Sequence, residues 1–170
     1  MILLVALVCA APFVSAWIAY YFYKPQGGKS YGTLLPTKSV VSTQEKDTLL
    51  DGKLKGKWVL IQTESQPCEA ACREGLYASR QARTMLGRDK DRLVRVLVVK
   101  GALTKDIVAD HPELLVAPNI DVRMASDPAS PSVLLIDPLG NQVISFPKNS
   151  PDIKKMNADL MRLLKASRIG

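Results

Sequence analysis

Two cysteines lie four positions apart in the stretch ESQPCEAACREG, and they are the residues of this chain best suited to chemistry. Cys68 and Cys72 are two of only three cysteines in 170 residues. A pair at this spacing can form a redox-active disulfide or hold a soft metal ion through two thiolates. It can also be two buried side chains that lie close through packing alone. The elements around the pair decide between these interpretations.

The residues before the pair predict a buried strand, and those after it predict a helix. Residues 58–61 are a continuous apolar run, and residues 69–86 place apolar side chains at three- and four-residue spacing. Cys68 would therefore lie at the start of a helix, where unpaired amide groups and the helix dipole stabilise a thiolate. Cys72 would lie one turn inside, close enough for a disulfide if Cys68 is at the non-helical cap. This position favours a working dithiol or soft-metal site over inert packing.

The rest of the chain alternates between strands and helices. A second central strand is predicted at 93–99, a helical stretch at 104–115 interrupted near His111-Pro112, a hairpin at 132–136 and 141–146, and a last amphipathic helix from 152 to 164. The arginines at 73, 80 and 83 share one side of the first helix and are expected to form a solvated face. This order of elements predicts an α/β fold, a thioredoxin-like three-layer sandwich, with the cysteine loop at the carboxyl edge of the sheet.

The N-terminus predicts a membrane anchor. Residues 2–23 contain no charged side chain and are long enough to cross a bilayer as a helix. Aromatic residues gather at 17–23 and Lys24 follows, as at a membrane interface. A cleaved signal peptide is the alternative, but the run lacks a basic leader and continues past the small residues at 14–16. We predict a transmembrane anchor at 1–24, a linker and irregular or hairpin-like lead-in at 25–55, and one compact domain at 56–170.

The charge of the chain bears on its partners and its orientation. The net charge is +7 and the isoelectric point is about 9.4. A basic domain near a membrane is attracted to anionic lipid heads or to an acidic partner, whereas no nucleic-acid-binding motif accompanies the scattered basic residues. Lys24, Lys29 and Lys38 follow the anchor and favour a cytoplasmic domain. The aromatic belt and the paired cysteines favour the periplasm, so we expect a single-pass protein of the bacterial inner membrane with a periplasmic domain.

The run GKWVLIQTESQPCEAAC at 56–72 and the run LIDPLG at 135–140 resemble the Sco (SenC) family. These are membrane-anchored, thioredoxin-like copper proteins that assist assembly of cytochrome c oxidase. The resemblance covers most of the domain after the anchor. It implies a role in maturation of the oxidase copper site, with a periplasmic thiol or copper protein, such as an oxidase subunit, as partner.

The sequence departs from that family at its copper ligands. Sco proteins have a histidine just before the hairpin strand, where this chain reads DPASP at 127–131. The single histidine, His111, is expected to be an ordinary exposed residue rather than a ligand. Pro131 precedes the strand at the position where thioredoxins keep a cis-proline facing the disulfide, so it is the third predicted site residue. A trans proline that opens a strand is an equal alternative.

Three functions are consistent with these residues. As a thiol–disulfide oxidoreductase, the chain would use Cys68, Cys72 and Pro131 and would need no cofactor. As a Cu(I) metallochaperone, it would hold the ion with Cys68 and Cys72, with Met124 as a weaker third candidate. Two cysteines and a distant histidine fall short of a structural zinc site. As an assembly scaffold, it would not need the cysteines at all.

Overall fold

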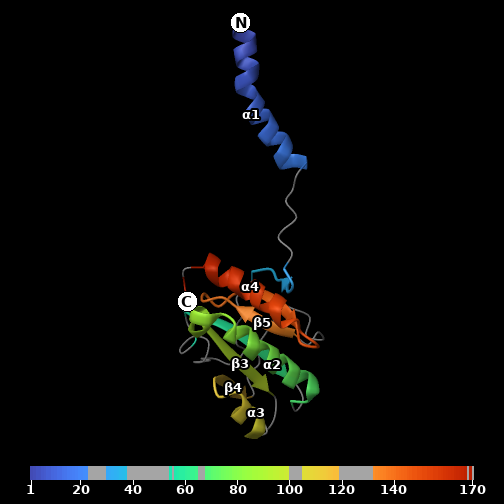
Figure 1. The fold of residues 1–170 in the computed structure, drawn as a ribbon, viewed down its shortest axis with the longest axis vertical. Helices are drawn as coiled ribbons and strands as arrows, with labels where there is room; N and C mark the ends of the chain where they lie inside the picture. Colours follow the sequence, from blue (N-terminus) through green and yellow to red (C-terminus); the bar gives the residue numbers. More distant parts are fainter. Residues whose placement is uncertain are drawn as a thin grey trace.

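An apolar helix begins the chain and stands apart from an α/β domain (Figure 1). The computed structural model describes residues 1–22, 30–37, 54, 56–64, 68–99, 105–118, 132–167 and 169. Helix α1 spans Ile2–Phe22, and its segment Leu4–Phe22 is long and apolar enough to cross a membrane. Trp17 and Tyr21 are in contact near its end, with ring centroids 5.1 Å apart and the ring planes tilted by 52°. The predicted anchor is therefore a helix with the length and composition of a membrane span.

Six strands form one mixed sheet in the order β1-β6-β5-β2-β3-β4. Their bounds are Thr33–Leu34 for β1, Trp58–Glu64 for β2, Leu93–Val99 for β3, Leu114–Pro118 for β4, Ser132–Ile136 for β5 and Gln142–Pro147 for β6. Strand β2 lies between β3, to which it is parallel, and β5, to which it is antiparallel. Its pairing with β3 starts at Trp58 opposite Leu93 and ends at Glu64 opposite Val99. A strand flanked on both sides is buried, which is why its sequence is a continuous apolar run.

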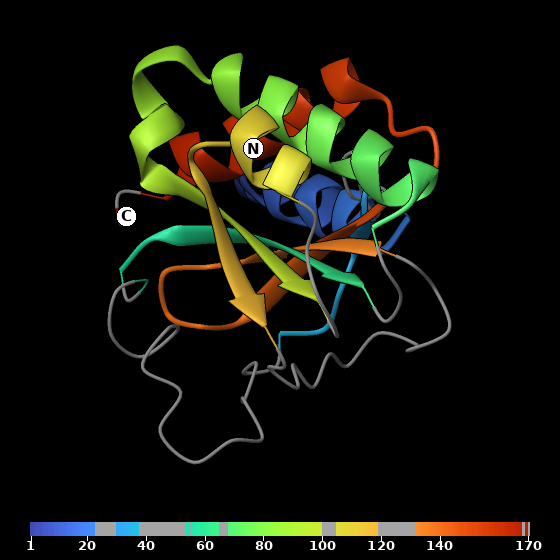
Figure 2. The same cartoon turned by 90° about the horizontal axis from the view of Figure 1, so that it is seen from below.

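The helices of the domain lie over one face of this sheet (Figure 2). They are α2 at Ala70–Thr84, the 3-10 helix η2 at Gly87–Arg92, the short α3 at Lys105–Asp110 and α4 at Ile153–Ala166. Leu60 of β2 faces them and packs with Ala82 of α2 and Leu160 of α4. The predicted mixed α/β fold is confirmed. Of the three predicted layers, the described residues show the sheet and one helical layer.

The opposite face of the sheet is also apolar. Val59 and Ile61 alternate with Leu60 along β2 and pack with Leu54, which precedes the strand. All four side chains are nearly inaccessible to solvent. Alternation along a pleated strand sends neighbouring side chains to opposite faces, so β2 contributes to both cores.

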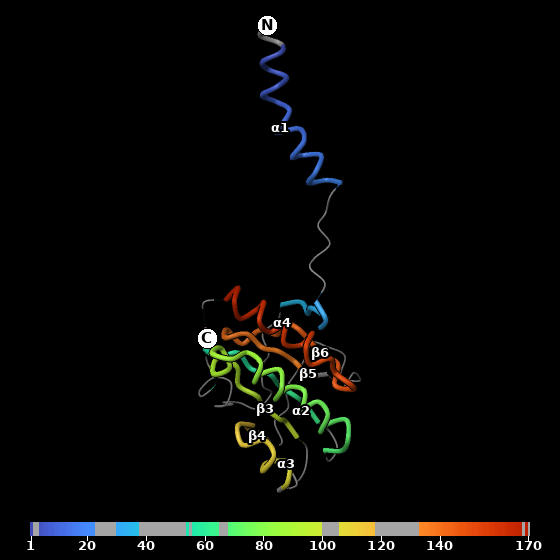
Figure 3. Tube along the Cα trace, viewed as in Figure 1, coloured from blue at the N-terminus to red at the C-terminus, as the bar shows by residue number. Residues whose placement is uncertain are grey.

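Part of the predicted lead-in belongs to the sheet. Strand β1 pairs with β6, and the backbone amides of Tyr31 and Gly32 donate to the Asp159 carboxylate of α4 at 2.7 and 3.0 Å. A Cβ at Gly32 would approach the Ile144 side chain to 2.6 Å, so this close contact requires glycine. Figure 3 shows the segment beside α4 and β6. The anchor is thus joined to the domain at a fixed edge of the sheet.

The prediction of a helix through residue 115 was wrong. Helix α3 ends at Asp110, and Leu114 begins strand β4, which runs parallel to β3. Pro112 prevents continuation of the helix, and a short apolar run after it can form either a strand or a buried helical turn. Pairing with β3 decides the outcome, which a local pattern does not reveal.

Candidate functional site

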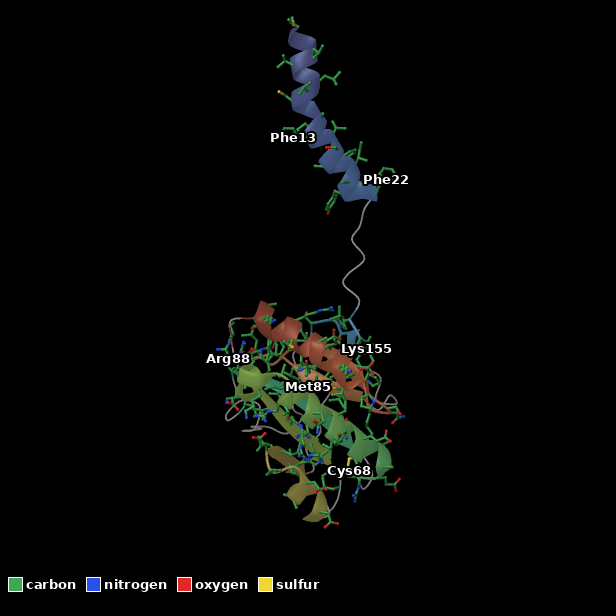
Figure 4. All side chains as sticks on the ribbon, in the orientation of Figure 1. Phe13, Phe22, Cys68, Met85, Arg88 and Lys155 are labelled. Atoms are coloured by element: carbon green, nitrogen blue, oxygen red, sulfur yellow. A yellow bond between two sulfur atoms is a disulfide. The ribbon has the colours of Figure 1, made fainter. Side chains whose placement is uncertain are left out.

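Cys68 and Cys72 form a disulfide at the N-terminal end of α2, with their Cα atoms 5.2 Å apart (Figure 4). The two side chains differ in access to solvent. Cys72 is only 2% exposed, whereas Cys68 is partly exposed. A partner molecule can therefore reach the Cys68 sulfur more easily than the Cys72 sulfur.

The start of α2 gives the two cysteines different electrostatic surroundings. The N-cap residue is Glu69, in an extended conformation, so Cys68 immediately precedes the cap and Cys72 lies in the first turn. The Glu69 side chain makes no capping hydrogen bond to the first-turn amides. The position of Cys68 next to these amides favours its thiolate when the disulfide is reduced.

A buried polar network underlies the first turn of α2. Gln62 of β2 donates from Nε2 to the Cys72 carbonyl at 3.0 Å and to the Glu64 carboxylate at 2.9 Å. The other oxygen of Glu64 accepts from Lys148 Nζ at 2.6 Å, and both side chains are at least nine-tenths buried. A Cβ at Gly75 would approach Gln62 Oε1 to 2.9 Å, so the helix lies close above this network. The network connects the cysteine helix to the end of β2 and to the residue after β6.

Apolar side chains surround the buried cysteine. Cys72 packs with Leu76, Leu97 and Ile107, and Cys68 lies against the edge of this cluster. Leu97 belongs to β3 and Ile107 to α3, so three elements hold the base of the disulfide. Close packing of this kind restricts the Cys72 side chain to one position beneath Cys68.

The two cysteines are the soft ligands that the described residues bring together at this site. Among the described residues, no group of three or more histidine, cysteine or acidic side chains is placed to hold a metal ion. Two reduced thiolates suit Cu(I), which accepts sulfur ligands and low coordination numbers. The donor set therefore fits Cu(I) as cargo and does not fit a nitrogen-rich Cu(II) site.

The structure corrects two predictions about side chains near this site. His111 is not exposed: it is 8% accessible, and its Nδ1 has no partner among the described residues. Burial, followed by the charges of Arg95 and Arg80, lowers the pKa of His111 against an opposing effect of Asp110. The predicted solvated arginine face is also wrong at Arg83, which is mostly buried and donates from Nε to the Leu93 carbonyl at 2.8 Å.

Several predicted residues lie outside the residues that the structure describes. These are Pro131, Met124, the stretch 127–131 and the lysines at 24, 29 and 38. The role of Pro131 as a third site residue stays a prediction.

Sequence reasoning missed the polar residues beneath the disulfide. Gln62 and Glu64 continue β2 beyond its apolar run, and alternation along the strand puts both on the same face as Leu60. That signal marks them as buried polar residues close to the cysteines. No local pattern distinguishes Lys148, because its partner is 84 positions away in the sequence.

Comparisons with known proteins agree with this architecture. A family model described as "Transmembrane-like, thioredoxin-like, C-terminal domain" matches residues 58–167. No curated protein sequence gives a significant match.

Two solved structures share the fold at low sequence identity. Arabidopsis thaliana ScoI with copper bound is 16% identical, with a TM-score of 0.53 over 81% of this chain and 100% of that chain. Yeast Sco1 is 17% identical, with a TM-score of 0.52 over 79% of this chain and 99% of that chain. At these identities the likeness shows the fold, and the predicted Sco-type, thioredoxin-like fold is confirmed.

Proposed function

Because the chain belongs to the transmembrane-like, thioredoxin-like C-terminal domain family, we propose that it is a membrane-anchored thiol–disulfide oxidoreductase. Its substrates are protein thiols and disulfides, and its role is maturation of the copper site of cytochrome c oxidase. The observation that carries this proposal is the Cys68–Cys72 disulfide at the start of α2, with one accessible and one buried cysteine. The solved ScoI structure with copper bound supports the link to copper.

The reaction is a two-electron exchange in two steps. The reduced Cys68 thiolate attacks one sulfur of a partner disulfide, which forms a mixed disulfide and releases the first partner thiolate. Cys72, as a thiolate, then attacks the Cys68 sulfur, which closes the Cys68–Cys72 disulfide and releases the second partner thiolate. The partner gains two electrons, its thiolates take up the protons that the two cysteines lost, and this protein is oxidised. Glu69 and Glu74 oppose formation of a thiolate nearby and favour a reducing role.

We place the domain in the periplasm, held to a bacterial inner membrane by α1. Paired cysteines suit that oxidising compartment, and α1 has the length of a membrane span. The direct test of this placement is an alkaline phosphatase fused after Gly170, which is active only on the periplasmic side.

Replacement of both cysteines tests the function. In cells that lack this protein, we expect the wild-type chain to restore cytochrome c oxidase activity and oxidase-bound copper. The double variant Cys68→Ala, Cys72→Ala should restore neither, because it has no thiol to exchange and no sulfur to bind Cu(I). Immunoblotting of the membrane fraction controls for expression. Full restoration by the double variant would instead favour an assembly scaffold that acts through its anchor and basic surface.

Transfer of Cu(I) is the second candidate function, and the two-thiolate donor set favours it. In anaerobic titrations of the reduced full chain in detergent against a Cu(I) chelator, we expect one ion to bind and Cys68→Ser to lose it. Cu(II) should bind weakly, because it prefers nitrogen donors in tetragonal geometry. A tight Cu(II) complex with strong thiolate charge-transfer absorption would show that other ligands take part.

A further inference from the structure

A buried cation lies under the arginine side of α2. Arg95 of β3 is only 3% exposed and faces the helix. It donates from Nε to Ser79 Oγ at 3.1 Å and from Nη2 to the Leu76 carbonyl at 2.8 Å, and both acceptors are neutral. Among the described residues, no carboxylate lies within ion-pair distance of its guanidinium. A buried charge without a counter-ion is costly, so this site favours an anion.

Two more guanidinium groups add positive charge close to Arg95. Burial, then the charges of Arg83 and Arg80, lower the pKa of Arg95 to about 10, and Glu113 only partly opposes them. Arg83 already pairs with Glu113 and with Asp91. Arg80 donates from Nη1 to the Asp110 carbonyl at 2.8 Å and has no ion pair in the described part of the chain. Asp91 and Glu113 therefore serve Arg83, and Asp110 makes no ion pair with Arg80 or Arg95 in the described part of the chain. The exposed Arg80 and the buried Arg95 are left without a carboxylate partner there.

Arg80 and Arg95 both line a pocket. Two adjoining cavities, of about 210 and 170 Å³, lie between α2, α3 and the start of β4, and both are lined by Arg80 and His111. Arg95, Arg83 and its partner Glu113 line the smaller one, and Asp110 lines the larger one. Both volumes are below the roughly 300–1,000 Å³ of pockets that hold drug-sized ligands, so a group of a few atoms fits.

His111 adds a second, independent feature. It is more than nine-tenths buried, it lines both cavities, and its Nδ1 has no hydrogen-bond partner among the described residues. A buried ring nitrogen without a partner is rare in folded proteins, and a ligand in the pocket would satisfy it. A neutral imidazole can donate one N–H to an oxygen.

We infer that this pocket binds a small oxyanion, a carboxylate or phosphate group, between Arg80, Arg95 and His111. Guanidinium groups present several N–H donors in one plane and match the oxygens of both anions. The pocket is separate from the disulfide, and its ligand is neither the copper nor the thiol substrate proposed above. A metal cation is disfavoured there by the three neighbouring arginines.

The single histidine of the chain makes this inference measurable. The full chain, in detergent with histidine ring ¹³C labels, is titrated with inorganic phosphate and separately with acetate at constant ionic strength in chloride. We expect a saturable shift of the His111 signal and a concentration-dependent rise of the melting temperature, because the ligand binds the folded state. The anion with the lower dissociation constant assigns the pocket to phosphate or to carboxylate.

Three variants decide whether the pocket carries the effect. Arg80→Gln should raise the dissociation constant at least about tenfold, as expected for loss of a charge-assisted hydrogen bond. Arg95→Met should abolish binding and leave the chain at least as stable without anion, since it removes an uncompensated buried charge. Arg88→Gln is the matched control: Arg88 is exposed on η2 and lines neither cavity (Figure 4), so binding should change less than about twofold.

Two results would overturn the inference. One is the absence of any His111 shift beyond that caused by chloride. The other is an equal loss of affinity in Arg88→Gln and Arg80→Gln, which would mean a general attraction to a basic surface. If Arg95→Met does not fold, the comparison of Arg80→Gln with Arg88→Gln still tests whether the pocket binds the anion.

Discussion

In a chain with Cys72→Ser, a mixed disulfide between Cys68 and a partner protein is expected to accumulate, whereas Cys68→Ser should trap almost none. Cys68 is the accessible sulfur and lies beside the first-turn amides of α2, so it attacks first. Without Cys72 no thiol is placed to resolve the intermediate. Both variants also carry Cys9→Ser, because the third cysteine is exposed on α1. Non-reducing electrophoresis after acid quenching and alkylation measures the trapped species.

The reactivity of the thiols provides the control for this experiment. In the reduced Cys9→Ser chain, alkylation of Cys68 should be faster than that of Cys72 at neutral pH, because Cys72 is buried. Equal alkylation rates with no trapped species in either variant would show that the pair is a structural disulfide.

Replacement of Lys148 by methionine is expected to destabilise the domain by about 3–5 kcal/mol, the usual effect of removing one partner from a buried ion pair. Lys148 Nζ lies 2.6 Å from the Glu64 carboxylate, and the exposed fractions of the two side chains are 10% and 7%. The variant leaves a carboxylate buried with only Gln62 as a donor among the described side chains. Urea unfolding of the reduced and the oxidised full chain in detergent, followed by circular dichroism, measures the loss.

Two further variants separate the missing charge from the missing side chain. The double variant Glu64→Gln, Lys148→Met should recover most of the lost stability, because it removes both charges from the interior. Lys155→Met is the matched control: this lysine pairs with Asp152 at the surface, and the change should cost less than about 1 kcal/mol. Similar losses for Lys155→Met and Lys148→Met would contradict the assignment of a buried pair.

The central strands and the cysteine helix could be predicted because their patterns follow directly from burial. Strand β3 has the predicted bounds, and α2 begins within one residue of the prediction. Strand β3 is buried along nearly its whole length, and α2 buries one side against the core, so the first reads as an apolar run and the second as apolar residues at helical spacing. The spacing of the cysteines relative to that helix was enough to predict that the two could form a disulfide.

Features that depend on distant parts of the chain could not be predicted. His111 sits beside a proline after a short helix, a pattern typical of an exposed loop, yet its side chain is buried and lines a cavity with Arg80 and Arg95. Strand β4 depends on an edge that β3 provides, and the two residues of β1 are too few to show a period. Lys148 lies at the site because it follows β6, which places it next to Glu64 at the end of β2.

The attachment of Tyr31 and Gly32 to α4 limits how far the disulfide can travel from a membrane. The backbone is fixed to the domain at this point, and α1 ends at Phe22. The nine steps from Phe22 to Tyr31 can extend to at most about 32 Å. With α1 in a bilayer, the domain therefore stays within roughly its own diameter of the lipid surface. The disulfide can therefore meet cysteines of partners that are bound to the membrane or docked on it. It can meet cysteines of freely diffusing proteins only when those proteins approach the bilayer.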